Sequence, residues 1–271
     1  NKDTRIRLPN FMKKFRATAL FTIVGVFALA SVLSAADADT DSNWPRFRGS
    51  AGNGHGVGPV PTKWAADSLN WTIDLPVTGH SSPILWGNRI YLTGSTEGAT
   101  GVERRIVCID RDGEVVWNKV AAIGTGEKHH KMNSWATPSC ATDGQRVVAF
   151  FGVGGLHCFD LDGNKMWSSE LGEFAGGWGV GGSPVIHNNL VIQNCDAEGD
   201  SFVVAINKES GKEIWRTPRR SKPRGGWSTP IVVNVEGRDQ IVLNGEFGIQ
   251  AYDPTDGHET WFCKSFNGRG T

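Results

Sequence analysis

Beyond residue 40 the sequence lacks any sustained 3.6-residue apolar period, which argues against a helical bundle. It is also poor in tyrosine and methionine, with two and three residues, while it has 35 glycines and 11 tryptophans. Many glycines beside many large aromatic rings indicate short strands, tight turns and a recurring aromatic contact. The 28 basic residues balance the 28 acidic ones, so nothing in the charge indicates a nucleic-acid partner.

Several motifs of catalytic and cofactor sites are absent as well. The stretches GTGEK and GGWGVGG contain no Gly-x-x-x-x-Gly-Lys-Ser/Thr phosphate loop, and no helix is expected after either. The chain has neither a Gly-x-Ser-x-Gly nucleophile elbow nor a His-Glu-x-x-His zinc motif. His129 and His130 are adjacent, so their side chains point apart and make a poor metal site. The sequence therefore assigns no catalytic residue and no metal ligand.

The first 36 residues have the composition of a targeting segment. Residues 1–11 precede Met12 and are interpreted as an extension upstream of the natural start. Residues 12–36 read as a secretory signal peptide, with a basic MKKFR start, an apolar stretch of 17 residues and small residues for cleavage. A retained membrane anchor is the alternative, and no cysteine lies nearby for lipid attachment. We expect a periplasmic or secreted protein that contacts a membrane only through this segment.

Two markers recur along the rest of the chain with nearly the same period. A turn followed by Trp occurs in DGEVVW, DGNKMW, SGKEIW and DGHETW, whose tryptophans are 50, 48 and 46 residues apart. A Ser-Pro or Thr-Pro pair recurs at spacings of 55, 46 and 46 residues. Each period reads as four short strands separated by Gly, Asn or Asp, the size of a propeller blade of roughly 40–50 residues. The repeated residues are Gly113, Gly163, Gly211 and Gly257 in the turns, followed by Trp117, Trp167, Trp215 and Trp261.

The five cysteines are explained by this repeat. Cys108 and Cys158 lie nine residues before a repeat Trp, where the other two periods have Ala205 and Ala251. The position therefore requires a small apolar side chain, and a free Cys serves as one. We interpret both cysteines as core residues, because a disulfide between equivalent places in different blades is geometrically implausible. The remaining three are also interpreted as structural: Cys140, Cys195 and Cys263.

The repeat resembles that of a known family. AINKESGKEIW, which begins at Ala205, and AYDPTDGHETW, which begins at Ala251, resemble the Ala-x-Asp-x-x-Thr-Gly-x-x-x-Trp repeat of the pyrroloquinoline-quinone (PQQ)-like propellers. The resemblance covers residues 43–271, and NWPRFRG near its start is like the exported members that lack an obvious cofactor site. It implies that each repeat Trp packs against the small residue and the glycine of a neighbouring blade.

The resemblance also implies an all-β propeller and a division of the chain. We expect an N-terminal extension over residues 37–78, with a closing strand near Trp71, and four four-stranded antiparallel blades over residues 79–271. In this family such blades form rings of seven or eight, so these four are expected to be an incomplete arc of a longer protein. A closed four-bladed ring is the alternative.

Candidate binding residues lie in the links between blades. These links meet on one face of a propeller, where binding groups are usual. The position three residues before each marker Pro holds His80, Trp135, Gly181 and Trp227, either as an aromatic rim for a ligand or as packing residues of the inner strand. Basic residues in two links either receive an anionic ligand or partner or are solvated loop charge. These are His129, His130, Arg219 and Arg220.

Three functions remain after these exclusions. The first is a non-catalytic exported scaffold that binds a protein partner or a ligand and holds no cofactor, as the resemblance to outer-membrane assembly propellers implies. The second is a PQQ- and calcium-dependent alcohol or sugar dehydrogenase, a class that commonly uses an adjacent cysteine pair, which this sequence lacks. The third is carbohydrate binding, which requires Trp135 and Trp227 to be exposed and to face one cleft.

Overall fold

The computed structural model describes the chain from residue 43 to residue 264 with three short gaps. The expected extension (residues 1–11) and signal peptide (residues 12–36) lie outside the described residues. Within the described part, no helix has both the length and the apolar character needed to cross a membrane. The described ranges are residues 43–58, 61–65, 68–220 and 225–264.

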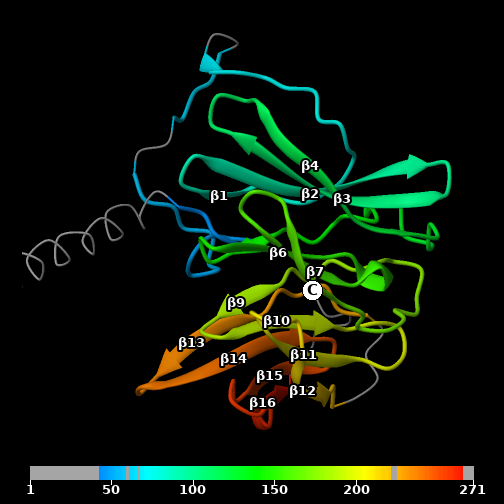
Figure 1. Cartoon of the computed structure of the whole chain (residues 1–271). Helices are drawn as coiled ribbons and strands as arrows, with labels where there is room; N and C mark the ends of the chain where they lie inside the picture. The colour runs from blue at the N-terminus through cyan, green and yellow to red at the C-terminus, as the bar shows by residue number, and fades with distance from the viewer. Residues whose placement is uncertain (1–42, 59–60, 66–67, 221–224, 265–271) are drawn as a thin grey trace, which may run out of the picture. The chain divides into compact units, whose positions relative to one another are not determined.

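Four antiparallel sheets of four strands follow one another in chain order (Figure 1), which confirms the expected all-β propeller repeat. The first sheet consists of β1 (Ile84–Trp86), β2 (Arg89–Gly98), β3 (Gly101–Asp110) and β4 (Val115–Gly124). The second consists of β5 (Ala141–Thr142), β6 (Arg146–Phe150), β7 (Leu156–Asp160) and β8 (Lys165–Ser169), with the 3-10 turn η4 (Gly152–Gly154) between β6 and β7. The third consists of β9 (Val185–His187), β10 (Leu190–Cys195), β11 (Phe202–Asn207) and β12 (Glu213–Pro218). The fourth consists of β13 (Ile231–Val235), β14 (Arg238–Gly245), β15 (Gly248–Tyr252) and β16 (Glu259–Lys264).

A small residue faces the repeat Trp across the third and fourth strands of every sheet. Directly opposed side chains of an antiparallel pair have Cβ atoms only about 4.5–5.5 Å apart, so a small residue leaves room for the indole. In each sheet the register shifts just after this pair, which places the same bulge before every turn. The opposed pairs are Cys108–Trp117, Cys158–Trp167, Ala205–Trp215 and Ala251–Trp261.

Three of the repeat tryptophans reach into the turn of the next sheet. Trp167 is 8% exposed and donates its indole N–H to the carbonyl oxygen of Lys208 at 2.8 Å. Its ring covers Gly211, which has φ +71°, and a Cβ atom at Gly211 would lie only 2.8 Å from that ring. The turn therefore requires glycine both for its backbone conformation and for the close approach of the indole. The equivalent contacts are those of Trp117 with Leu161 and Gly163, and of Trp215 with Pro254 and Gly257.

Trp71 and Trp261 occupy the two ends of this series. Trp71 donates its indole N–H to Arg111 O at 2.6 Å and covers Gly113, so it repeats the contact of a blade tryptophan on the first sheet. The residues around Trp71 form no named strand, which differs from the expected closing strand, because the described residues offer them no partner strand. Trp261 is 40% exposed and bonds to Gln240 of its own sheet, so it covers no turn glycine in the described part.

Apolar cores lie between successive sheets and contain four of the five cysteines. One core joins residues of the first and second sheets, one joins the second and third, and one joins the third and fourth. Cys108, Cys140, Cys158 and Cys195 are buried free thiols, whereas Cys263 is exposed. Burial raises the pKa of Cys108 to about 11 and that of Cys158 to about 12, and it also raises the pKa of Cys140 and Cys195.

We expect a thiol reagent to modify only Cys263 in the native protein. The other four thiols are inaccessible and are held protonated, so they lack the thiolate that reacts. The measurement is mass spectrometry of the native protein after iodoacetamide treatment, with the urea-unfolded protein as the control in which all five sites react. Modification of Cys108 or Cys158 before unfolding would contradict the described packing.

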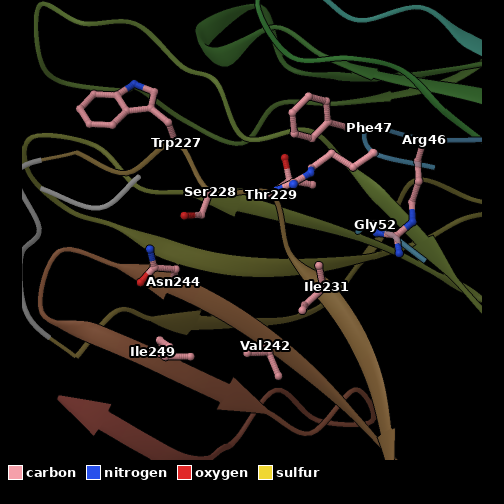
Figure 2. Close-up of a pocket in the computed structure, with 11 residues that line it drawn as sticks. Arg46, Phe47, Gly52, Trp227, Ser228, Thr229, Ile231, Val242, Asn244 and Ile249 are labelled. Atoms are coloured by element: carbon pink, nitrogen blue, oxygen red, sulfur yellow. The ribbon is translucent and has the colours of Figure 1, made fainter. Parts of the chain in front are cut away.

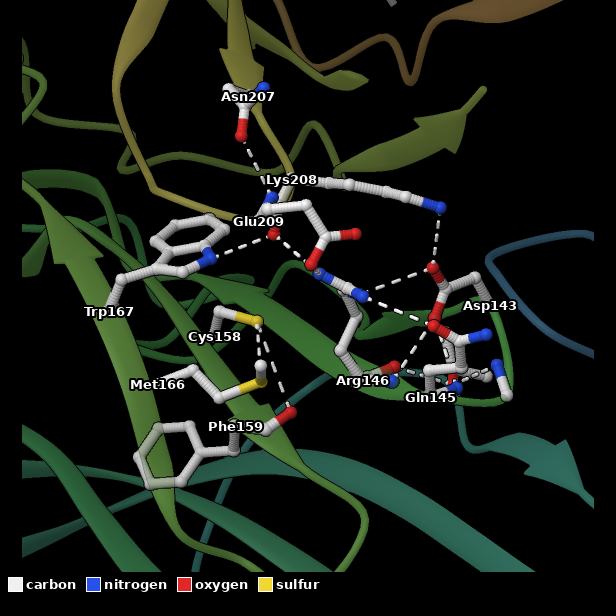
Figure 3. A network of polar contacts seen from close by, with 12 residues as sticks. Asp143, Gln145, Arg146, Cys158, Phe159, Met166, Trp167, Asn207, Lys208 and Glu209 are labelled. Carbon is white, nitrogen blue, oxygen red and sulfur yellow. Dashed lines mark hydrogen bonds and ion pairs between the residues drawn. The ribbon is translucent and has the colours of Figure 1, made fainter. Parts of the chain in front are cut away.

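An ion-pair network on the turns joins the second and third sheets (Figure 3). The buried Arg146 side chain pairs with Asp143 at 3.2 Å and with Glu209 at 2.8 Å, and it also donates to Lys208 O at 2.8 Å. Lys208 in turn pairs with Asp143 at 3.0 Å. Burial alone would raise the pKa of Asp143, but the Lys208 hydrogen bond and the other partners hold it below its ordinary value. Lys208 O thus accepts from both Arg146 and Trp167, so the network reinforces the tryptophan contact.

The N-terminal segment of residues 43–56, which we call the strap, crosses the inner strands of several sheets. Trp44 exchanges two backbone hydrogen bonds with Leu85 of β1, both at 2.9 Å. Pro45 O accepts from the backbone N–H of Thr142 in β5 at 2.8 Å. The guanidinium of Arg46 reaches Pro230 O, just before β13, at 3.5 Å. The strap thus covers part of the inner edges that would otherwise expose unpaired backbone groups.

Candidate functional site

The links that follow a fourth strand lie on one side of the sheets, which we call the loop face. Antiparallel strands alternate in direction, so the hairpins between second and third strands lie on this side too. The first sheet extends furthest toward it, because β2, β3 and β4 have ten residues each and the corresponding strands of the other sheets have five to eight. The opposite side carries the turns with the repeat glycines.

Ring contacts run across three links of the loop face. His129 lies edge-on to Trp135 within the first link, with ring centroids 4.9 Å apart. His130 stacks on Trp178 of the second link at 4.2 Å, and Trp178 contacts Trp227 of the third link at 6.0 Å. We call these five residues the aromatic chain. Four of them were candidates from the sequence; Trp178 was not, because it lies within GGWGVGG and not at the repeated position before a marker Pro.

Backbone groups of neighbouring loops fix two indoles of the aromatic chain. Trp135 donates its indole N–H to Glu127 O at 2.8 Å. Trp227 donates to Gly179 O of the preceding link at 2.9 Å, and its ring lies against Gly181, where a Cβ atom would be 2.9 Å from the indole. Both indoles are half-buried. Each ring therefore packs along one edge and leaves another edge on the loop face.

Among the described residues, the two indoles line different cavities. Trp135 lines a cavity with Leu75 and Thr96, whereas Trp227 lines a different cavity bordered by the strap. His80, at the equivalent position of the first sheet, is exposed, and its backbone N–H donates to Ala136 O at 3.2 Å. The described cavities therefore do not bring both indoles to one cleft, which is the arrangement that the carbohydrate alternative requires.

Arg219 and Arg220, predicted either to receive an anionic ligand or partner or to be solvated loop charge, both pair with acidic residues of the chain. Arg219 is buried, and its Nε donates to Asp196 Oδ1 at 2.9 Å, while its Nη1 donates to Tyr252 OH at 2.6 Å. Arg220 is exposed, pairs with Glu259 and stacks on Phe262, with the guanidinium carbon 4.7 Å from the ring centroid. Arg219 therefore supports the loop from inside, and Arg220 binds across to β16. Both charges are therefore paired within the described part of the chain.

Asp196 is a buried carboxylate that the sequence did not single out. Its side chain has no exposed surface, and its Oδ2 has no hydrogen-bond partner among the described residues. Burial raises the pKa of Asp196 above its ordinary value, although Arg219 lies beside it. Nothing in CDAEGD marks it, because Glu198 and Asp200 in the same loop are exposed acids of the same kind.

A cavity of about 350 Å³ lies between the strap and the fourth sheet (Figure 2). The strap contributes two arginines and Phe47, and the third link contributes Trp227. The sequence had indicated Trp227 but none of the strap residues, since NWPRFRG carries no repeat period. The full lining is Arg46, Phe47, Arg48, Gly52, Trp227, Ser228, Thr229, Ile231, Val242, Asn244 and Ile249.

The donor groups of the described residues do not fit PQQ with a calcium ion. Calcium takes six to eight oxygen ligands, usually several from carboxylates. The described part of the chain brings no three His, Cys, Asp or Glu side chains together in a position to hold a metal ion. No two cysteines are adjacent, and four of the five are packed in the cores.

The comparisons with known proteins agree with the repeat. A family model described as outer membrane protein assembly factor BamB matches residues 62–192 and 102–267. Among solved structures, the chain is similar to the quinohemoprotein alcohol dehydrogenase ADHIIG from Pseudomonas putida HK5, with 17% identity, a TM-score of 0.53, and coverage of 73% of this chain and 36% of that one. It is also similar to a europium-containing methanol dehydrogenase, with 12% identity, a TM-score of 0.56, and coverage of 74% and 46%. No curated protein matches the chain.

A structure of BamB from Moraxella catarrhalis aligns as well, with 18% identity, a TM-score of 0.46, and coverage of 72% of this chain and 54% of that one. The alignments therefore span about a third to a half of these proteins. At such identities, the similarity to the two dehydrogenases shows the propeller fold alone.

Proposed function

The chain belongs to the PQQ-like repeat family of the outer membrane protein assembly factor BamB, and from this premise we propose that it is an exported, non-catalytic scaffold that binds a partner on its loop face. The observation that carries the proposal is the aromatic chain, in which ring contacts at 4.2 and 6.0 Å join three links of that face and a further contact at 4.9 Å lies within the first link. Protein interfaces are enriched in such half-buried aromatic anchors.

The surroundings of the aromatic chain support a binding surface. Met132 lies in the same link and is 64% exposed, and Lys128 and Lys131 beside it are exposed as well. The backbone hydrogen bonds of Trp135 and Trp227 hold the rings in place before any partner arrives. A pre-organised surface loses less conformational entropy on binding, which favours affinity.

A PQQ- and calcium-dependent dehydrogenase is the second candidate. The observation that favours it is the propeller fold shared with the two dehydrogenases described above. Fold alone does not carry a function, because function depends on the groups of the site. The described residues bring no three His, Cys, Asp or Glu side chains together to hold calcium, so this second candidate rests on the fold alone.

We expect a photo-reactive amino acid at Met132 to crosslink a defined partner in the exported protein. The matched control is the same substitution at Ile214, which is 50% exposed on the outer strand β12 of the third sheet and away from the loop face. Trp178→Ala should reduce the Met132 crosslink about tenfold or more, because truncation of an aromatic anchor at an interface costs about 2 kcal/mol or more. A melting curve of Trp178→Ala checks that the sheets stay folded.

Two outcomes would count against the scaffold. One is equal crosslinking from Met132 and Ile214, which would remove the special role of the loop face. The other is stoichiometric binding of PQQ with calcium, accompanied by dye-linked oxidation of an alcohol or a sugar, which would establish the dehydrogenase instead.

A further inference from the structure

A second, smaller cavity on the loop face carries an inference about the partner. It lies between the second link, the third link and the hairpin that joins β10 to β11, and the described residues that line it include none of the fourth sheet. Its volume is about 20 Å³, which suits one group the size of a water molecule, for which about 10–15 Å³ is needed. Three aromatic rings and two carboxylates border it: Phe174, Trp178, Trp227, Asp196 and Glu198.

The aromatic walls of this small cavity are held in place by contacts within the chain. Phe174 lies edge-on to Phe150 of the core, with ring centroids 5.5 Å apart. The planes of Trp178 and Trp227 meet at 68°, so the two indoles form a corner. The bond from the Trp227 indole N–H to Gly179 O, at 2.9 Å, fixes one side of that corner. Aromatic faces attract a cation within about 6 Å of the ring centroid, and those of Trp do so best.

Glu198 places a negative charge at the mouth of the small cavity. It is exposed, and its carboxylate takes part in no ion pair or hydrogen bond among the described residues. Gly176 has φ +124°, and a Cβ atom there would lie 2.9 Å from Glu198 Oε2, so the glycine lets the carboxylate lie against the second link. The other carboxylate, that of Asp196, is already paired with Arg219. Glu198 is therefore the uncompensated charge of the wall.

The lining of the small cavity contains no basic side chain among the described residues. Lys128 of the first link lies beside it, with Cε 3.9 Å from the position of a Cβ atom at Gly177, but Lys128 is exposed and does not line it. Aromatic rings together with an unpaired carboxylate favour a cation, because each attracts positive charge. An anionic partner, expected from the basic residues of the links, does not suit this wall.

We propose that the small cavity binds the ammonium group of a lysine side chain on the partner protein, an inference that rests on the scaffold function proposed above. The ammonium pairs with Glu198 and lies in the corner formed by Trp178 and Trp227. The apolar stem of the lysine packs along Phe174. An ammonium is a compact point charge that suits the volume of about 20 Å³, whereas the planar guanidinium of arginine is larger.

The test is binding of N-acetyl-L-lysine methylamide to the exported protein, measured by the shifts of the indole N–H signals in nuclear magnetic resonance spectra. A neutral analogue has a methyl group in place of the ammonium and keeps the length of the side chain. We expect it to bind about tenfold or more weakly, as for loss of a charge-assisted hydrogen bond. The corresponding arginine probe keeps the charge on a larger group, and it should also bind about tenfold or more weakly.

The matched variants are Glu198→Gln and Glu170→Gln. Glu170 is an exposed glutamate at the start of the second link, and it does not line the small cavity. Glu198→Gln should lose about tenfold or more in affinity for the lysine probe and should reduce the Met132 crosslink to the partner, while Glu170→Gln should leave both unchanged. Glu198 is exposed, so its variant is expected to stay folded, which a melting curve verifies.

Several results would overturn the proposal: equal binding of the lysine probe and its neutral analogue, equal or tighter binding of the arginine probe, no binding of any probe, or no effect of Glu198→Gln. Lys128→Gln tests the opposite charge preference, because it removes a cation beside the small cavity. A lysine on the partner predicts that the Met132 crosslink is kept or strengthened in this variant. Loss of the crosslink would instead assign an acidic surface to the partner.

The probe and the crosslink separate this inference from the scaffold function. If the lysine probe fails to bind and the Met132 crosslink persists, only the inference about the small cavity is lost. If the probe binds but Met132 crosslinks no better than Ile214, the scaffold function fails, and the small cavity remains a site for an ammonium group.

Discussion

We expect Trp167→Ala to lower the free energy of unfolding by about 3–5 kcal/mol, the cost of deleting a large buried aromatic side chain. Trp167 is 8% exposed and belongs to the core shared by the second and third sheets. Its removal leaves a cavity against Cys158 and Gly211, and Lys208 O loses one of its two donors. The loss affects both sheets, because the indole belongs to one and binds the turn of the other.

Trp261→Ala is the matched control, since it removes the same residue from the same place in the repeat. Trp261 is 40% exposed and donates only to Gln240 of its own sheet, so we expect a loss of about 1 kcal/mol or less. The measurement is urea unfolding followed by far-ultraviolet circular dichroism, which does not depend on tryptophan emission. Equal losses in the two variants would mean that the contact with the next sheet contributes little.

Arg219→Met should be the most damaging single change of a charged residue on the loop face. Arg219 and Asp196 form an ion pair whose side chains are 3% and 0% exposed. Removing the arginine leaves the buried carboxylate without an ionic partner among the described residues, and breaking such a pair costs about 3–5 kcal/mol near neutral pH. The double variant Asp196→Asn and Arg219→Met should recover most of the loss, because no charge then remains buried.

The pH dependence of Arg219→Met distinguishes charge from packing. The pKa of Asp196 is raised in the folded protein, so between the unfolded and folded values the native state binds the additional proton. Stability therefore falls as pH rises through this window, and loss of Arg219 raises the folded pKa further. We expect the destabilisation to be small at acid pH, where Asp196 is protonated in both states, and to grow toward neutral pH.

Arg220→Met is the control for the neighbouring position. Its side chain is 52% exposed, and its pair with Glu259 is largely solvated, so unfolding should stay close to that of the original protein at every pH. A destabilisation by Arg219→Met that stays constant from acid to neutral pH would contradict the buried-charge explanation and would assign the loss to packing.

The repeat made the blade contacts predictable from the sequence. Trp167, Cys158 and Gly211 recur at equivalent places in other periods, and a pattern repeated four times fixes strands, register and turn together. The same pattern also predicted a contact with a neighbouring turn for Trp261. Trp261 has the motif, but it covers no turn glycine among the described residues. The sequence repeat specifies the indole; the contact also requires the next sheet.

The loop face was predictable only in outline. Trp135 and Trp227 were indicated by their position and His129 and His130 as basic residues of a link, and all four lie in the aromatic chain. Trp178, which contacts both His130 and Trp227, lies in a stretch without a period. The burial and the partners of the charged residues were even less predictable from the sequence. Arg219 and Arg220 are adjacent residues of the same type. Arg219 is nevertheless buried against Asp196, whereas Arg220 is exposed and pairs with Glu259.

By itself the sequence determined the four-stranded repeat, the turns and the small residues opposite each tryptophan, because these depend on contacts close along the chain and repeated at a fixed interval. Only the tertiary structure decided which charges are compensated, and that the strap brings Arg46 to Pro230, 184 residues away. The contacts of loops that lack the sequence repeat cannot be predicted from a pattern, because the sheets that these loops lie against determine their conformation.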